Sequence, residues 1–275
     1  MSKAEEQTRK KRKMGDGRES DATKWPKIKP KQNLKVSYLK NHDLFTVQNY
    51  FTSDESKAFV KIAESMGFTH QGSLGPAKGE AYRDNDRISV NDPVLADTIW
   101  QSGLSKLFSD IKIKGKIAVG LNPNIRFYRY SAGQRFGRHI DESVDLGDGK
   151  ETHYTLLIYL SGGGNNNNNG PKSKSRSKSS DSNDSLPQPL VGGETVFYGS
   201  RNSVVAEIDP LQVAPVEGMA LFHIHGDKCM LHEARNVSKG INLGLFIPLV
   251  NCVPFLFMEN DTQLISIWRK HRGGV

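Results

Sequence analysis

His139 and Asp141 are the residues whose types and spacing first indicate chemistry. Successive side chains of a β-strand alternate between its two faces, so residues two positions apart share a face. On a strand, this pair offers one nitrogen and one carboxylate oxygen to the same cation. A further histidine on a neighbouring strand would complete a set of two histidines and one carboxylate. Such a set leaves coordination positions open and is typical of non-haem Fe(II).

A His-x-Asp tripeptide is not specific by itself, because most such tripeptides lie on protein surfaces. Whether the tripeptide indicates a metal site depends on the secondary-structure elements that would position it. From residue 117 onward, short β-type runs alternate with clusters of Gly, Pro or Asp, a pattern that predicts strands. The predicted strands comprise residues 118–121, 125–130, 154–160, 195–198, 219–223 and 241–250, with an earlier one at 44–50.

Two helices are predicted before this strand-rich part. Thr52 and Glu55 have the spacing of a capping box, and apolar residues at helical spacing follow over residues 58–66. A second helix is predicted to begin after Asp92 and Pro93. Two helices followed by many short strands predict a mainly β fold, a barrel or double-sheet roll with the N-terminal helices packed on one sheet.

The chain has 275 residues and a formal net charge of +8, and this charge is concentrated at one end. Residues 1–35 contain twelve basic and five acidic side chains, a net charge of +7, and almost no apolar residue besides Trp25. This composition buries too little surface to offset the entropy of ordering, so we expect residues 1–36 to be a disordered basic arm. The basic run at 9–13 is typical of a nuclear localisation signal or a nucleic-acid contact.

A second low-complexity segment interrupts the strand-rich part at residues 162–190. It contains consecutive asparagines and then alternating Lys and Ser, has a net charge of +2 and shows no hydrophobic periodicity, so we expect a long surface insertion. The rest of the chain is close to neutral. We therefore expect one ordered domain over residues 37–250, with this insertion, and a divergent C-terminal tail over residues 251–275.

The sequence also bears on the compartment. No apolar run approaches the length of about 20 residues that a bilayer span needs, and the N-terminus has no apolar segment typical of a secretory signal. Two cysteines, Cys229 and Cys252, make no disulfide scaffold and suit a reducing compartment. We expect an intracellular protein, nuclear or cytoplasmic, that is neither secreted nor bound to a membrane.

Several motifs, taken in order along the chain, resemble one enzyme family. They are the segments 81–88 (AYRDNDRI), 154–160 (YTLLIYL), 192–197 (GGETVF) and 231–234 (LHEA). Together with His139 and Asp141, they resemble the prolyl-4-hydroxylase-like branch of the 2-oxoglutarate and Fe(II)-dependent oxygenases. The resemblance extends from residue 44 to residue 240, outside the insertion. It implies a double-stranded β-helix, or jelly-roll, core.

The resemblance implies an iron site and a reaction. Carried over by position, the metal ligands, which are also the catalytic residues, are His139, Asp141 and His232. The implied cofactors are Fe(II), 2-oxoglutarate as co-substrate, and ascorbate. The implied reaction uses O₂ to hydroxylate a protein side chain, for example that of a proline, and releases succinate and CO₂.

Two other histidines compete for the place of His232. His223 lies within a predicted strand, where a packed core histidine is the more common interpretation, and His225 precedes a predicted turn. Two tyrosines match the family's co-substrate pocket. Tyr159, on the strand after the metal pair, matches a tyrosine that contacts the co-substrate, and Tyr130 lines the same pocket by analogy. Each tyrosine also fits the alternative of an aromatic residue that fills the core.

One position departs from the family. The family anchors the far carboxylate of 2-oxoglutarate with a Lys or Arg, and the matching position, ten residues after His232, is Asn242. A neutral amide hydrogen-bonds a carboxylate but does not neutralise it. Beyond Gly240 the resemblance ends, which indicates an alternative ending, for instance from differential splicing, that binds Fe(II) better than 2-oxoglutarate. The apolar run 243–250 can still close the sheet as a strand.

The leading function is an iron and 2-oxoglutarate oxygenase that acts on a protein or peptide. One alternative is a catalytically impaired jelly-roll binding protein, which Asn242 favours. Another is oxidative demethylation of nucleic acid, prompted by the basic arm. The near-neutral ordered part disfavours it, because phosphate binding needs a cationic groove. If nucleic acid binds this chain, we therefore expect it to contact only the basic arm.

Overall fold

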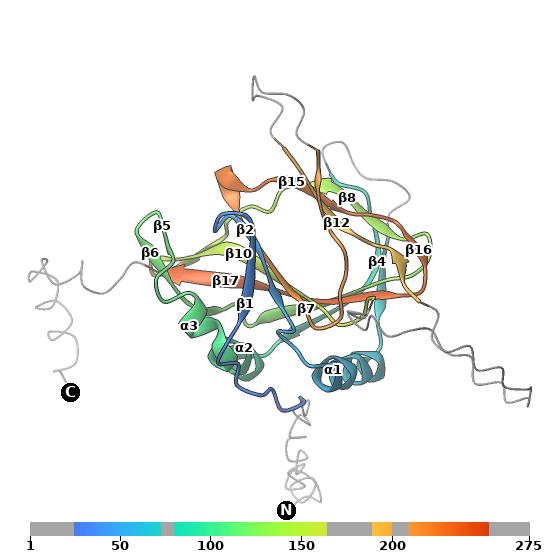
Figure 1. Ribbon diagram of the computed structural model, residues 1–275, viewed down its shortest axis with the longest axis horizontal. Helices are drawn as coiled ribbons and strands as arrows, with labels where there is room; N and C mark the ends of the chain where they lie inside the picture. The colour runs from blue at the N-terminus through green and yellow to red at the C-terminus, as the bar shows by residue number, and fades with distance from the viewer. Residues whose placement is uncertain (1–24, 73–79, 164–188, 200–208, 253–275) are drawn as a thin grey trace, which may run out of the picture.

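The computed structural model describes residues 25–72, 80–163, 189–199 and 209–252. These residues form a mainly β fold in which two facing layers of strands are covered on one side by helices (Figure 1). The basic run at 9–13, most of the insertion and the tail beyond residue 252 lie outside the described residues. The predictions made for those three segments therefore stay predictions.

The larger layer is antiparallel. Its strands, in spatial order, are β1 (Lys35–Lys40), β2 (Leu44–Gln48), β14 (Ala220–Ile224), β10 (Lys150–Tyr159), β17 (Asn242–Cys252), β7 (Asn124–Tyr130) and β4 (Arg83–Asn91). Four short strands pair at its margins: β3 (Thr69–Gly72), β5 (Lys112–Ile113), β6 (Lys116–Leu121) and β9 (Asp145–Gly147).

The smaller layer faces the larger one and is joined to it by β4, which pairs with β7 and also with β8. Its strands, in order, are β8 (Arg135–His139), β15 (Leu231–Ala234), β12 (Thr195–Tyr198) and β13 (Leu211–Val213). A short ribbon of β11 (Val191–Gly192) and β16 (Val237–Lys239) lies apart from both. From β7 onward the main strands alternate between the layers, which is the predicted double-stranded β-helix.

The N-terminal helices cover the outer face of the larger layer, as predicted (Figure 1). They are α1 (Ser53–Met66), α2 (Pro93–Ile99), the π-helical segment η1 (Trp100–Leu104) and α3 (Ser105–Leu107). The predicted capping box is present: Glu55 N donates to Thr52 Oγ1 over 3.2 Å, and Thr52 N donates to the Glu55 carboxylate over 2.7 Å. Asp92 caps α2 by accepting from Leu95 N over 2.9 Å. These caps explain where both helices begin.

β10 and β17 each separate the core from the cavity. One set of alternate side chains joins the apolar core beneath the helices, and the other faces the smaller layer, as strand geometry requires. The core set is Tyr154, Leu156, Ile158, Leu243, Leu245 and Ile247, and the cavity set is Thr155, Leu157, Tyr159, Asn242, Gly244 and Phe246.

The ordered part begins earlier than the predicted boundary at residue 37. Trp25 stacks between Phe59 and Phe127, with ring centroids 5.8 Å apart in both pairs, and its Nε1 donates to Asp92 over 2.6 Å. Residues 25–36 are therefore not part of a disordered arm. Average composition does not show this, because one large, partly buried aromatic ring that packs against the core anchors an otherwise polar segment.

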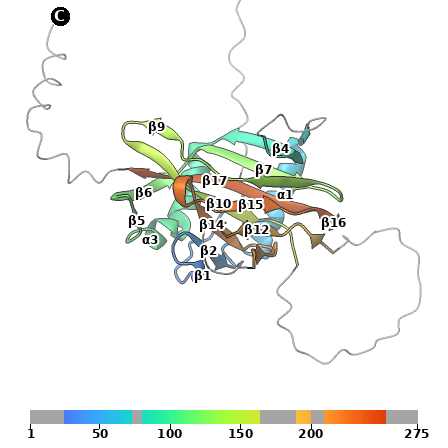
Figure 2. The same cartoon turned by 90° about the horizontal axis from the view of Figure 1, so that it is seen from above.

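The last described strand, β17, lies in the centre of the larger layer. β17 pairs with β10 on one side and with β7 on the other, and Figure 2 shows it running through the middle of the molecule. The run 243–250 thus closes the sheet, as predicted, and Asn251 and Cys252 extend the same strand rather than beginning a separate tail. None of the described helices is long and apolar enough to span a bilayer.

Candidate metal centre

A cavity of about 130 Å³ lies between the two layers, and all six of the predicted site residues line it. Its wall comprises Arg83, Arg126, Tyr128, Tyr130, Phe136, His139, Asp141, Thr155, Leu157, Tyr159, Thr195, His223, His232, Ala234, Asn242, Gly244 and Phe246. The strands of both layers therefore meet at one polar cavity, although these residues are spread over more than 160 positions of the sequence.

Three residues are placed as a group of metal ligands. His139 ends β8, His232 lies on β15, and these two residues are paired in the ladder between the strands. Asp141 follows β8, and its Oδ1 lies 3.7 Å from His139 Nε2. One ligand atom from each of the three lies within 4.8 Å of the others, which is close enough for a single ion.

The two histidines are held in the tautomer that metal binding needs. His139 Nδ1 donates to the carbonyl of Gly137 over 2.8 Å, and His232 Nδ1 donates to the carbonyl of Met230 over 2.9 Å. In both rings the bonded nitrogen is Nδ1, so Nε2 keeps its lone pair for a cation. Backbone carbonyls commonly orient metal-binding histidines in this way.

Charge states in the group also suit a metal. Burial, and then the neighbouring His232, lower the pKa of His139 to about 4, so its ring is neutral at neutral pH. Burial raises the pKa of the Asp141 carboxyl, but the imidazoles of His223 and His232 and the hydroxyl of Thr155 outweigh burial and hold the pKa well below its usual range. Neutral imidazole and ionised carboxylate are the forms that bind metal.

Asp141 is held by a second set of contacts. Thr155 Oγ1 donates to Asp141 Oδ2 over 2.7 Å and lies 2.8 Å from His225 Nε2. His223 Nε2 and His225 Nε2 lie 3.7 Å and 3.9 Å from the same oxygen. Oδ2 is therefore occupied by protein groups, while Oδ1 faces His139.

The competing histidines take different positions. His225 precedes η2 (Gly226–Lys228), so it stands before a turn as predicted, and it is buried behind Thr155 outside the cavity lining. His223 is a buried strand residue, as predicted, but it also lines the cavity with its ring 4.5 Å from that of His232. This proximity of His223 to His232 was not predicted from the sequence. The spacing of two residues between His223 and His225 could have indicated it, because residues two positions apart on a strand share a face, and both histidines face Asp141.

The predicted co-substrate residues line the cavity wall. Tyr159 on β10 exchanges a hydrogen bond of 2.7 Å with Thr195 on β12, which ties the two layers together. Tyr130 on β7 pairs in register with Asn242 on β17, and Asn242 Nδ2 donates to the carbonyl of Gly193 over 3.0 Å. Burial raises the pKa of both tyrosines, so their hydroxyls stay protonated at neutral pH.

Two arginines in the cavity wall were not predicted. The Arg83 guanidinium lies 4.1 Å from the ring centroid of Phe136, and that of Arg126 lies 5.9 Å from the ring centroid of Phe246. Among the described residues, no carboxylate lies within 4.0 Å of either guanidinium. Alternation gave a signal for Arg126, because it shares a strand face with Tyr130. The two guanidinium groups thus bring positive charge to the wall of the cavity, whereas the side chain at position 242 in the same wall is neutral.

The fold and these residues define a class of site. A jelly roll presents two histidines and one carboxylate, each with a free ligand atom, at one cavity between its two layers. This is a candidate mononuclear metal centre of the type with two histidines and one carboxylate, which leaves positions open for further ligands.

Several solved structures are similar to this chain. No family model matches the chain, and no curated protein matches it. A viral collagen prolyl hydroxylase from Paramecium Bursaria Chlorella virus-1, solved as a 2OG complex, has a TM-score of 0.48 and 15% identity, covering 78% of this chain and 98% of its own. A prolyl-4-hydroxylase from Pseudomonas putida has a TM-score of 0.45 and 16% identity, covering 77% and 94%.

A third similar structure is a prolyl hydroxylase from Trichoplax adhaerens in complex with a peptide fragment of the hypoxia inducible factor oxygen degradation domain. Its TM-score is 0.48 and its identity 13%, with coverage of 77% of this chain and 84% of its own. Each likeness is to the fold alone, because no identity exceeds 16%. The assignment of the site rests on its own side chains.

Proposed function

We propose that this chain is an Fe(II)- and 2-oxoglutarate-dependent dioxygenase that hydroxylates a side chain of a protein or peptide. The observation that carries the proposal is the group His139, Asp141 and His232, whose ligand atoms lie within 4.8 Å of one another and which all line one cavity, with both Nδ1 atoms bonded to backbone carbonyls. Fe(II), 2-oxoglutarate and O₂ together supply the oxidation, which releases succinate and CO₂, and ascorbate keeps the iron reduced.

The protein's own residues position these reactants. The Gly137 and Met230 carbonyls orient the two rings, and Thr155 holds the carboxylate of Asp141. An aromatic ring restricts one histidine further: Phe136 stacks on His139 with ring centroids 3.8 Å apart. A preorganised ligand set loses little entropy when the ion binds.

Binding of 2-oxoglutarate also requires positive charge in the cavity wall. The buried far carboxylate of 2-oxoglutarate needs a cation, and Asn242 supplies none. We propose that Arg83 and Arg126 supply this charge in place of the residue at position 242, since neither is paired with a carboxylate among the described residues. Tyr159, Tyr130 and Asn242 add polar contacts in the same wall.

The test is an anaerobic titration of the purified chain with Fe(II) and then 2-oxoglutarate, followed by the metal-to-ligand charge-transfer absorption of the complex. We expect this band in the wild-type chain and its loss in His139→Ala and Asp141→Asn. A matched control is His70→Ala, which alters an exposed histidine on β3. Absence of the band in a folded wild-type chain that binds Fe(II) would contradict the proposal.

One observation favours a second candidate function. Asn242 Nδ2 is already bonded to the carbonyl of Gly193, so the position that anchors the co-substrate in the family is neutral and occupied. A jelly-roll binding protein without turnover would follow if 2-oxoglutarate does not bind. Succinate release with and without candidate peptides separates the two: turnover that depends on peptide supports the oxygenase.

A further inference from the structure

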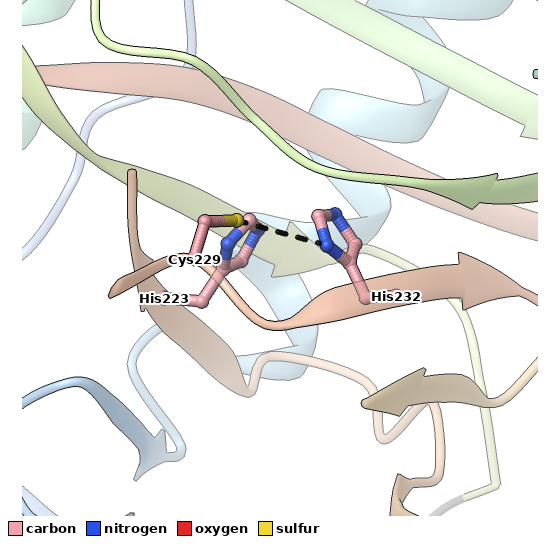
Figure 3. A group of neighbouring side chains, drawn as sticks. All are labelled: His223, Cys229 and His232. Atoms are coloured by element: carbon pink, nitrogen blue, oxygen red, sulfur yellow. Dashed lines mark hydrogen bonds between the residues drawn. The ribbon is translucent and has the colours of Figure 1, made fainter. Parts of the chain in front are cut away.

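Cys229 brings a thiol beside the candidate metal centre. His223 lies on β14, Cys229 follows η2, and His232 lies on β15, so a single turn gathers all three (Figure 3). One ligand atom from each residue lies within 4.8 Å of the others. Cys229 Sγ also lies 4.0 Å from His232 Nδ1, the nitrogen that donates to the Met230 carbonyl, so Nε2 is the His232 atom left for a cation.

His223 contributes unused binding capacity to this group. Its side chain is 7% exposed, and its Nδ1 has no hydrogen-bond partner among the residues that the structure describes. Its nearest described ionic neighbour, Asp141 Oδ2, lies 3.7 Å from Nε2, which is beyond hydrogen-bonding distance. A buried ring nitrogen without a partner is costly, and a bound cation would remove that cost.

The donor set differs from that of the iron group. A thiolate and two imidazoles favour softer divalent ions such as Zn²⁺, whereas two imidazoles and a carboxylate suit Fe(II). Three protein ligands with one solvent ligand satisfy the tetrahedral preference of Zn²⁺.

We propose that His223, Cys229 and His232 form a second cation site that binds Zn²⁺ or a similarly thiophilic divalent ion. On binding, the sulfur–metal bond forms as the thiol proton passes to solvent, with no change in oxidation state. The Met230 carbonyl holds one nitrogen of His232, so His232 offers one ligand atom and serves one ion at a time. The thiophilic ion therefore excludes Fe(II), a consequence that rests on the proposed function.

The experiment uses Co²⁺ as a spectroscopic probe of the metal-free full chain. Thiolate ligation produces intense sulfur-to-cobalt charge-transfer absorption in the near ultraviolet. We expect this absorption in the wild-type chain and in Asp141→Asn, which removes a ligand of the iron group only. We expect it to be lost in Cys229→Ser and kept in Cys252→Ser, which alters the other cysteine.

Affinity and competition provide a second readout. Measured against a chromophoric chelator, Zn²⁺ binding should weaken about tenfold or more in Cys229→Ser. Zn²⁺ should also suppress the Fe(II) and 2-oxoglutarate band at lower concentration in the wild-type chain than in Cys229→Ser. Near-ultraviolet circular dichroism of each metal-free variant checks that it is folded.

The outcomes separate this site from the proposed function. Cobalt absorption that is absent in the wild-type chain, or that persists in a folded Cys229→Ser, overturns the second site. Cobalt absorption that depends on Cys229, in a chain with no Fe(II) and 2-oxoglutarate band, supports the second site and counts against the oxygenase.

Discussion

His139 on β8 lies directly opposite His232 on β15, and their ring centroids are 4.2 Å apart. The strand pairing thus places two residues that are 93 positions apart in the sequence at one point. A shift of one residue in the pairing would turn His232 to the outer face of the sheet. Phe197, whose ring stacks on His232 at 5.3 Å, occupies the strand on the other side and holds this register.

Thr155→Val should weaken Fe(II) binding while the fold is kept. The change removes the hydroxyl that donates to Asp141 Oδ2 over 2.7 Å and leaves a side chain of similar shape. Loss of such a supporting contact typically lowers metal affinity about 10- to 100-fold. Isothermal titration with Fe(II) under anaerobic conditions measures the effect. Thr46→Val, at a buried position on β2, is the control, and equal affinities in the two variants would argue against the role of Thr155.

Arg83→Gln and Arg126→Gln should weaken 2-oxoglutarate binding and leave Fe(II) binding nearly unchanged. Each change removes a cation that faces the cavity without a paired carboxylate among the described residues. We expect a loss of at least about tenfold, equivalent to roughly 1.4 kcal/mol, from titration of the charge-transfer band.

The control is Arg87→Gln, on the same strand as Arg83 and outside the cavity lining. Adding Asn242→Lys to the arginine variants should restore binding, because it places a cation in the same wall. If both arginine variants bind 2-oxoglutarate like the wild-type chain, the arginines do not neutralise its carboxylate.

Glu55 should make the stability of the chain depend on pH. Burial raises the pKa of its carboxyl, but hydrogen bonds from Lys29 N, the Lys31 ammonium and Thr52 N outweigh burial and lower the pKa below 4.5. The folded state therefore holds the ionised form more strongly than the unfolded state does. This contribution is present above pH 4.5 and is lost as pH falls through the lower folded pKa.

Urea unfolding at several pH values measures this dependence. The free energy of unfolding of Glu55→Gln should fall less on acidification than that of the wild-type chain. Asp54→Asn, an exposed change in the same helical turn, should behave like the wild-type chain. Parallel curves for Glu55→Gln and the wild-type chain would mean that Glu55 does not anchor the segment around Lys31.

Asn251→Val should stabilise the fold. Asn251 is 1% exposed on β17, and within the described part of the chain neither polar atom of its side chain has a hydrogen-bond partner. Removing an unsatisfied buried amide from a strand should raise the free energy of unfolding by roughly 1 kcal/mol. Thermal and urea unfolding measure the gain. Asn91→Val, at an exposed position on β4, should change stability by less than about 0.5 kcal/mol, and a gain of equal size there would contradict the explanation.

Local features of the sequence determined much of this protein. The capping box at Thr52 and the cap at Asp92 begin their helices where predicted, because each involves contacts within three residues. The predicted strand ranges correspond to β2, β6, β7, β10, β12, β14 and β17, because alternation of side chains is a property of the extended backbone. Strands β4, β8 and β15 were not among the predicted ranges. His139 ends β8 and Asp141 lies just beyond the strand, yet the two residues fall in one group as their spacing predicted. The resemblance predicted His232 as the third ligand, and the structure brings it into the same group.

Only the tertiary structure decided which distant side chains meet. It brought His223 and Cys229 to His232, placed Arg83 and Arg126 in the cavity wall, and packed Trp25 against Phe59. Each of these contacts depends on strand order, register and helix packing, which bring together residues far apart in the chain. Periodicity within one segment contains no information about the segment it pairs with, so spacing alone predicted the metal pair but not the cations or the thiol around it.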